Sequence, residues 1–253
     1  MSFITHKPLI IFALAFAGLW LAAWLGASLR KKKPLNSALQ QDFSLILAAT
    51  LTLLGLLIGF SFSMAASRYD QRKNYEEAEA NAIGTEYVRA DLLPAADAAK
   101  VRDLLRKYVW QRIGFYTADD AAVAQIDAET AQLQSALWSA VVAPAALQPT
   151  PVVALAVSGM NDVLNAQGYT QAAWWNRIPV SAWILMGVIG VCCNSLVGYG
   201  SRAAAPRSPL LLILPLFVSL AFMLIDDIDT PRHGLIRVAP QNLTSLAAAL
   251  QPK

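Results

Sequence analysis

Charged residues are scarce in this sequence of 253 residues, of which 15% are Asp, Glu, Lys or Arg. A typical soluble domain has about 25%. Apolar residues reach 56%, so the composition excludes a disordered protein and argues against a purely soluble one. The formal net charge is +3, which is too small to predict a surface for nucleic acid.

Cysteine and histidine are also rare. The two cysteines, Cys192 and Cys193, are adjacent, and adjacent cysteines seldom form a disulfide with each other. The sequence therefore predicts no disulfide framework, and its cysteines do not indicate whether the protein lies in an oxidising or a reducing compartment. It has only two histidines and no Gly-rich phosphate loop, HExxH, GxSxG or CxxC motif, so we predict neither an enzyme nor a bound cofactor.

Four long runs without a charged residue account for the composition. A helix needs about 17–25 apolar residues to cross a bilayer, and each run is long enough, although the last is near the lower limit. A single run could instead be a buried core helix, but four together favour membrane spans. The runs are Pro8–Leu29, Phe43–Ser67, Ile178–Ser201 and Ser208–Ile225.

The first run is predicted to be a retained span rather than a signal peptide. It is too long for the apolar core of a signal peptide, and Arg30 and three lysines follow it in place of a cleavage site.

The spans divide the chain into four parts. We predict an all-α integral membrane protein with a first transmembrane hairpin over 1–67 and a second over 178–228. A helical extramembrane domain, 68–177, lies between them, and the tail, 229–253, is expected to dock on this domain. No proline follows the second span until Pro94, so this span is predicted to continue through Ser67–Leu93 as one long helix.

The middle of the chain has the spacing of amphipathic helices. An apolar stripe follows Pro94 at three- and four-residue steps, and Thr117 with Asp120 resembles a capping box. Pro144, Pro149 and Pro151 predict a loop, followed by a helix over about Val152–Ala166. Trp174 and Trp175 are expected in an interfacial aromatic belt. The stripe consists of Val101, Leu104, Leu105, Tyr108 and Val109.

Small residues recur every four positions in the second span. Gly55, Gly59, Ser63 and Ser67 share one helix face, which would either let another helix approach closely or line a narrow pore. Phe60 and Phe62 lie nearby and could form an apolar constriction.

Three carboxylates follow the fourth span. Asp226, Asp227 and Asp229 stand at a helix C-terminus, where the helix dipole disfavours negative charge. Ion pairing with Arg68, Arg72, Arg232 or Arg237 is one interpretation, and a hard cation such as Ca²⁺ is the weaker one. We therefore expect Asp226–Val238 to dock near the membrane end of the second helix. Arg89 is separately expected to pair with an acidic side chain, with Glu86 and Asp91 close in sequence.

Several segments resemble a known family. Leu56–Arg72, LLIGFSFSMAASRYDQR, looks like the second transmembrane helix of bestrophins. Glu79–Leu93 (EANAIGTEYVRADLL), Asn176–Pro179 and Asp227–Val238 (DIDTPRHGLIRV) resemble the bacterial bestrophin-like domain family more closely. The resemblance covers about 45–250. One departure is that Gln71 and Arg72 follow Tyr69 and Asp70, without the usual Trp of bestrophins.

This resemblance implies a pentameric anion channel in the bacterial inner membrane, with lipid and small ions as partners and a pore along the second helix. Phe60 and Phe62 would lie near its neck. The alternative is a non-conducting sensor or scaffold whose helical domain binds a partner. A pore requires the Gly55–Ser67 face to point at a symmetry axis, whereas a scaffold predicts that this face packs within the subunit.

The orientation stays open because two arguments conflict. The short loops carry six basic residues and only Asp42 as an acid, which places these loops in the cytoplasm and the helical domain outside. The resemblance to bestrophins implies a cytosolic helical domain. The basic residues are Arg30, Lys31, Lys32, Lys33, Arg202 and Arg207.

Overall fold

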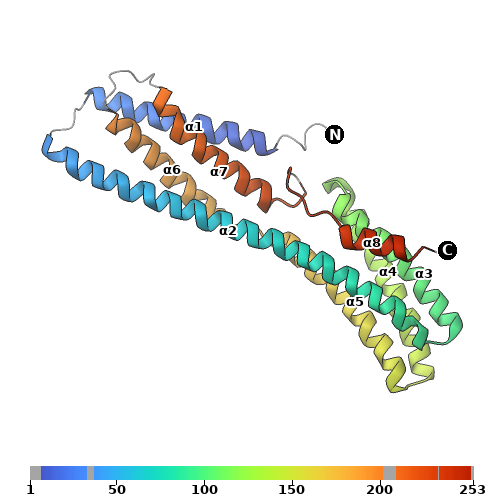
Figure 1. Cartoon of the computed structure of the whole chain (residues 1–253). Coiled ribbons are helices and arrows are strands. Elements are labelled where there is room, and N and C mark those ends of the chain that lie inside the picture. The colour runs from blue at the N-terminus through green and yellow to red at the C-terminus, as the bar shows by residue number, and fades with distance from the viewer. Residues whose placement is uncertain (1–6, 33–36, 202–208, 233, 252–253) are drawn as a thin grey trace. The chain divides into compact units, whose positions relative to one another are not determined.

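Helices make up all the regular structure of the described chain. The computed structural model describes residues 7–32, 37–201, 209–232 and 234–251, and these contain no strand (Figure 1). Lys33, Arg202, Arg207 and Ser208, which entered the span and loop predictions, lie outside these residues. The helices are α1 (Lys7–Lys32), α2 (Ser37–Arg89), η1 (Ala90–Leu92), α3 (Ala95–Thr117), α4 (Asp120–Leu147), α5 (Pro151–Trp175), α6 (Val180–Gly200), η2 (Pro209–Leu212), α7 (Ile213–Asp229) and α8 (Gln241–Ala249).

The chain forms two compact units. The first, here called the membrane unit, comprises Met1–Arg68 and Arg177–Ile236. The second, the helical unit, comprises Tyr69–Asn176 and Arg237–Lys253.

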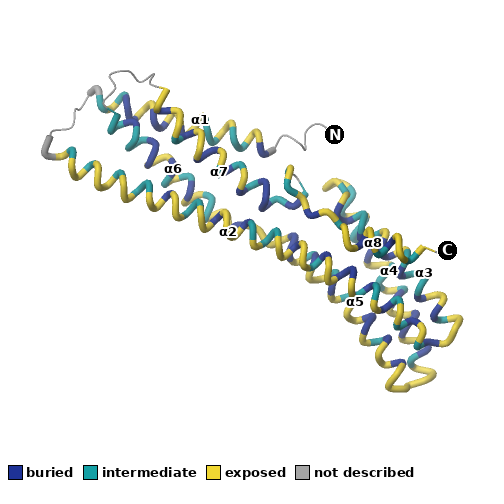
Figure 2. Tube along the Cα trace, viewed as in Figure 1, coloured by how far each residue is buried: buried dark blue, intermediate teal, exposed yellow. Residues whose placement is uncertain are grey.

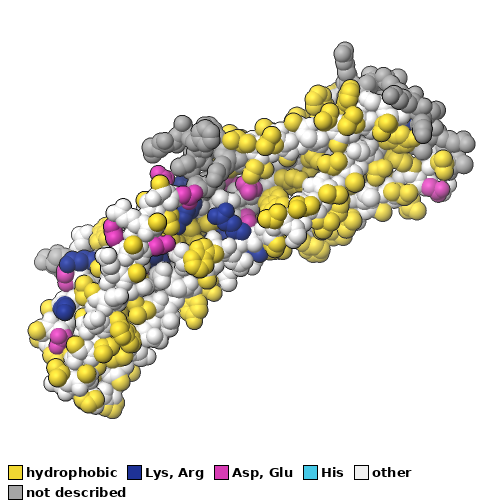
Figure 3. Space-filling view, turned by 180° about the vertical axis from the view of Figure 1, so that it is seen from behind, with side chains coloured by type: hydrophobic (Ala, Val, Ile, Leu, Met, Phe, Trp, Pro, Cys, Tyr) yellow, Lys and Arg dark blue, Asp and Glu magenta, His cyan; other side chains and the backbone are white. Residues whose placement is uncertain are grey.

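The membrane unit contains α1, the first half of α2, α6 and α7. Four helical segments of the described chain are long and apolar enough to cross a membrane, as the four runs predicted. Hydrophobic side chains cover much of the visible surface of this unit, as Figure 3 shows. The side chains packed inside it include Leu19, Leu54, Met186, Cys193, Val218 and Phe222.

The second span continues without a break, as predicted. Helix α2 has 53 residues and ends at Arg89. Gly84 does not interrupt it, since tertiary packing outweighs the weak helix propensity of glycine. Its missing side chain leaves room for Leu246 of α8, whose Cδ1 would lie 3.2 Å from a Cβ at this position.

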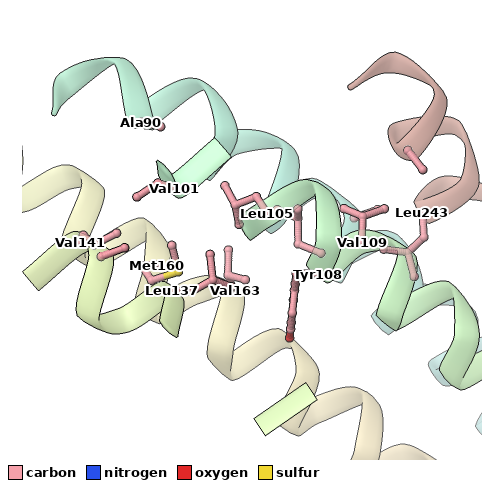
Figure 4. Close-up of a cluster of buried hydrophobic side chains, with 14 of the residues drawn as sticks. Ala90, Val101, Leu105, Tyr108, Val109, Leu137, Val141, Met160, Val163 and Leu243 are labelled. Atoms are coloured by element: carbon pink, nitrogen blue, oxygen red, sulfur yellow. The ribbon is translucent and has the colours of Figure 1, made fainter. Parts of the chain in front are cut away.

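The helical unit is built around one apolar core, contributed by the end of α2 and by α3, α4, α5 and α8 (Figure 4). Most of the predicted stripe on α3 is buried there, and Leu104 packs at its edge. Full burial of one Leu, Val or Met side chain stabilises a fold by about 1.5–3 kcal/mol. Figure 4 labels Ala90, Val101, Leu105, Tyr108, Val109, Leu137, Val141, Met160, Val163 and Leu243.

Two local predictions for this unit are wrong. Thr117 is the last residue of α3, where its hydroxyl donates to the carbonyls of Ile113 and Gly114, so it caps nothing. The N-cap of α4 is Asp119. Pro144 lies inside α4 rather than in a loop, and its buried ring offsets the hydrogen bond that proline cannot donate.

The start of α5 follows the expected signals. The Thr150 hydroxyl accepts from the Val153 amide at 3.2 Å, and Pro151 occupies the first turn. The predicted end near Ala166 is wrong, because α5 runs on to Trp175. Its inner side remains buried in that extension, through Ala166, Thr170 and Ala173.

The two adjacent tryptophans have different environments. Trp174 is buried in the helical unit, with its ring 4.9 Å from that of Phe115 and 5.4 Å from that of Tyr116. It therefore belongs to the core rather than to an interfacial belt. Trp175 is exposed.

Candidate functional site

The small-residue face of α2 is open within the subunit. Gly55, Gly59, Ser63 and Ser67 are all exposed. Figure 2 shows exposed positions along much of the first half of α2. A Cβ added at either glycine would meet no atom within 4 Å outside its own helix. Phe60 exposes 67% and Phe62 41% of its surface.

The same helix packs against its own unit through other positions. Leu54, Ser61 and Ala65 are buried, and Leu51, Leu57 and Ile58 lie against the apolar cluster. The contacting positions recur at helical spacing and exclude the Gly55–Ser67 series. The glycine and serine face therefore does not serve packing within the subunit.

Close helix packing occurs instead between α1 and α6. A Cβ at Gly26 would overlap the Ser195 carbonyl, and one at Gly198 would overlap the Ala23 carbonyl. Glycine at these two positions lets the two backbones touch. This crossing was not predicted from the sequence, although Ala22 and Gly26 show the same four-residue spacing as the small residues of α2.

The turn after α7 is held by two of the three aspartates. Asp227 accepts from the backbone amides of Leu235 and Ile236 at 2.8 and 2.9 Å. Asp229 accepts from the Ile178 amide at 2.9 Å and lies 3.4 Å from the guanidinium of Arg68. Both carboxylates are nearly inaccessible to solvent, so these contacts compensate their burial.

The remaining members of the charge cluster lie around this turn. Asp226 and Arg232 are half-buried on either side of the end of α7. The structure thus brings Arg68 together with Asp229, as the ion-pairing interpretation expected. No group of three or more His, Cys, Asp or Glu side chains in the described ranges is placed to hold a metal ion.

Arg72 is buried in the helical unit at the C-terminal end of α5. Its guanidinium donates to the carbonyls of Ala173 and Asn176, each at 3.2 Å. Carbonyls at a helix C-terminus lack partners within the helix and carry partial negative charge, so a cation is stabilising there.

Arg89 is paired, as predicted, but with a partner from another helix. Its guanidinium lies 3.8 Å from the carboxylate of Asp162 on α5. Asp91 is bound by Arg102 of α3, and Glu86 makes no hydrogen bond. The side chains of the Arg89 pair expose 34% and 62% of their surface, so the pair is worth about 0–1 kcal/mol.

Three further carboxylates of α2 lie buried in the helical unit. Glu79 is ion-paired with Arg112 and accepts from the Thr170 hydroxyl at 3.0 Å. Glu76 accepts from the Leu243 amide at 2.9 Å and from the Asn242 side chain at 2.7 Å, which attaches α8 to α2. Glu86 is the third. Sequence reasoning missed them, although Glu76, Glu79, Ile83 and Glu86 follow a helical repeat.

The model of the Bestrophin-like domain family matches residues 9–243. No curated protein matches the sequence.

Several solved structures share this fold. A single-residue variant of a bacterial bestrophin homologue from Klebsiella pneumoniae is 13% identical, with a TM-score of 0.66, over 96% of this chain and 97% of that chain. Another structure of that homologue is 14% identical, with a TM-score of 0.64, over 96% of each chain. A third, described as a membrane protein, is 13% identical, with a TM-score of 0.65, over 99% of this chain and 98% of that chain.

At these identities the structural matches show a shared fold. The apolar helices and the family match together identify a multi-pass membrane protein. Because the family model covers most of its length, the chain belongs to the Bestrophin-like domain family.

Proposed function

We propose that this protein is a homo-oligomeric membrane channel that conducts anions through a pore lined by α2. The open face of α2 is the observation that carries the proposal. A Cβ at Gly55 or Gly59 would meet no atom of the described residues outside its own helix, whereas Gly26 and Gly198 lie in the close contact between α1 and α6. An unused small-residue face on a membrane helix is best explained by a surface that meets other copies or ions.

The chemistry of this face suits a narrow water-filled path. Hydroxyls at Ser63 and Ser67 can replace part of the hydration shell of an ion, and glycine brings the backbone close to the axis. A lipid-facing surface would gain more from large apolar side chains.

Phe60 and Phe62 supply the proposed constriction. Both rings are exposed in the single chain, so neither is needed to fill the apolar cluster of the membrane unit. Aromatic rings have positive edges, which favour an anion over a cation where the rings meet it edge-on. Closely spaced rings also exclude water, which is a known way to gate a pore.

A homo-oligomer follows from this arrangement, because one α2 helix cannot enclose a path. We propose a pentamer, the assembly that the resemblance to bestrophins implies, in a bacterial inner membrane, as the bacterial relatives suggest. The scaffold alternative predicted that the Gly55–Ser67 face packs within the subunit, and its exposure favours the channel.

The decisive experiment is electrical. Purified protein is reconstituted into planar bilayers with asymmetric salt, and the reversal potential is measured. We expect currents that reverse near the equilibrium potential of chloride, and a changed unitary conductance in F60A. A homo-oligomer that forms normally but carries no current would favour the scaffold, and reversal near the cation potential would refute anion selectivity.

A further inference from the structure

Glu86 is an unusual carboxylic acid in the helical unit. It is 0% exposed, and neither of its oxygens has a hydrogen-bond partner. Buried polar groups in folded proteins nearly always have partners, so an exception calls for a physical explanation. The other buried carboxylates of α2, Glu76 and Glu79, both have partners.

The carboxyl group of Glu86 fits against the backbone of α5 at Gly159. A Cβ added at Gly159 would overlap both Glu86 Oε2 and Arg89 Nη1, so these two atoms flank the same point. They therefore lie within about 5 Å of each other, a range in which opposite charges attract strongly. No hydrogen bond joins them.

Arg89 consequently has two carboxyl groups within reach. One is Asp162 of α5, at 3.8 Å and largely exposed, and the other is the sealed Glu86 of its own helix. The nearby Asp91 does not compete, because Arg102 of α3 binds it.

Burial makes Glu86 a weak acid. Loss of solvation raises its pKa to about 8, since the charged form loses its water. The positive charge of Arg89 opposes this shift and the negative charge of Asp162 adds to it. Glu86 is therefore mostly neutral near pH 7, which is consistent with the absence of a hydrogen-bond donor to either of its oxygens.

We propose that Glu86 is a proton-binding site, and that release of its proton to solvent draws Arg89 away from Asp162 and toward Glu86. The guanidinium keeps its charge throughout. With Glu86 protonated, Arg89 links α2 to α5. With Glu86 ionised, Arg89 forms an ion pair three residues away within α2, and Asp162 is freed. All three residues lie in the helical unit, and the exchange of partners does not depend on ion conduction.

Infrared spectroscopy of the full-length protein in detergent tests the proton site. A protonated carboxyl has its own C=O stretching band, which disappears on ionisation. We expect a band that titrates with a midpoint near pH 8 in the unmodified protein and is absent in E86Q. E77Q, a change at an exposed carboxylate of the same helix, is the matched control and should leave the band intact.

Two further variants test the exchange of partners. D162N removes a negative neighbour and frees Arg89, so the midpoint should fall. R89Q removes the positive neighbour, so the midpoint should rise. Opposite shifts in the two variants would show that both charges act on the Glu86 carboxyl, which the exchange of partners requires.

Two results would contradict the proposal. A band that persists in E86Q, or no band titrating between about pH 6 and about pH 10, would show that Glu86 does not hold the proton. A Glu86 band whose midpoint ignores both D162N and R89Q would overturn the movement of Arg89. G159A provides a further check, because its methyl group occupies the space of the carboxyl and should shift the midpoint by displacing Glu86.

Discussion

The buried ion pair between Glu79 and Arg112 offers a direct test of what holds the helical unit together. Both side chains are 0% exposed. E79Q keeps the size of the side chain and its contact with the Thr170 hydroxyl but removes the counter-charge of Arg112. Breaking one partner of a buried pair typically costs about 3–5 kcal/mol, because the remaining charge is uncompensated.

The structure favours the lower end of that range. The Arg112 guanidinium also lies 4.5 Å from the centre of the Phe115 ring, which stabilises a cation by about 0.5–2 kcal/mol and survives the substitution. A glutamine oxygen can still accept one of its N–H groups. We therefore expect E79Q to lower the free energy of unfolding by about 3 kcal/mol.

Urea unfolding of the detergent-solubilised protein, followed by tryptophan fluorescence, measures this loss. Trp174 packs against Phe115 and reports on the same region of the core. E77Q changes an exposed carboxylate of the same helix and should stay within about 0.5 kcal/mol of the unmodified protein.

The double variant E79L/R112M distinguishes charge from packing. Replacing both charges by apolar groups should recover most of the loss, since an apolar pair needs no compensation. If E79Q is no worse than E77Q, the ion pair is not what stabilises this core. If the double variant is as unstable as E79Q, the loss comes from changed packing rather than from an unpaired charge.

Three other predictions follow from particular contacts. G59L should disrupt oligomer formation or conduction but leave the subunit folded. G18L, at another open glycine, should leave oligomer formation and conduction unchanged, whereas G198L should prevent folding. Size-exclusion chromatography with light scattering measures the oligomer, and bilayer recordings measure conduction. Raising the pH from about 4.5 to about 8 should lower the free energy of unfolding, because folded Glu86 keeps a proton that the unfolded chain releases. The free energy should fall by at most about 1.4 kcal/mol per pH unit, and this dependence should be lost in E86Q. An unchanged pH dependence in E86Q would exclude Glu86 as its source. E76Q should speed hydrogen exchange in Gln241–Ala249 by about tenfold or more, since a charged acceptor at the N-terminus of α8 is lost; unchanged exchange would mean that Glu76 does not fasten α8.

The helices of this protein could be predicted from its sequence because their causes are local. Uncharged runs specify the membrane spans, and the absence of proline after the second span specifies the long α2. The errors arose where tertiary packing outweighed a local signal. Pro144 usually ends a helix, but burial keeps it inside α4. Trp174 has the position of an interfacial residue, but Phe115 and Tyr116 enclose it.

The candidate sites were less predictable because their partners are distant in sequence. Arg89 was expected to bind an acid, yet nothing local identifies Asp162, which lies on another helix. The four-residue spacing of small residues also does not identify what their helix face contacts. In α1 it marks a contact within the subunit, and in α2 it marks a face that the subunit leaves open. The fold is needed to distinguish a contact within the subunit from an open face.

The inner face of α2 shows how partners, rather than residue type, determine the chemistry of a carboxylate. Glu76, Glu79 and Glu86 are all buried and follow one helical repeat. Glu76 meets the N-terminus of α8, whose unpaired amides and dipole favour its negative charge. Glu79 meets the guanidinium of Arg112, which compensates the same charge. Glu86 meets only the backbone of α5 and an arginine already paired with Asp162. Burying its protonated form therefore costs less free energy than burying its charged form. Two of these carboxylates therefore fasten the unit through a helix terminus and an ion pair, and the third makes one of its contacts conditional on pH.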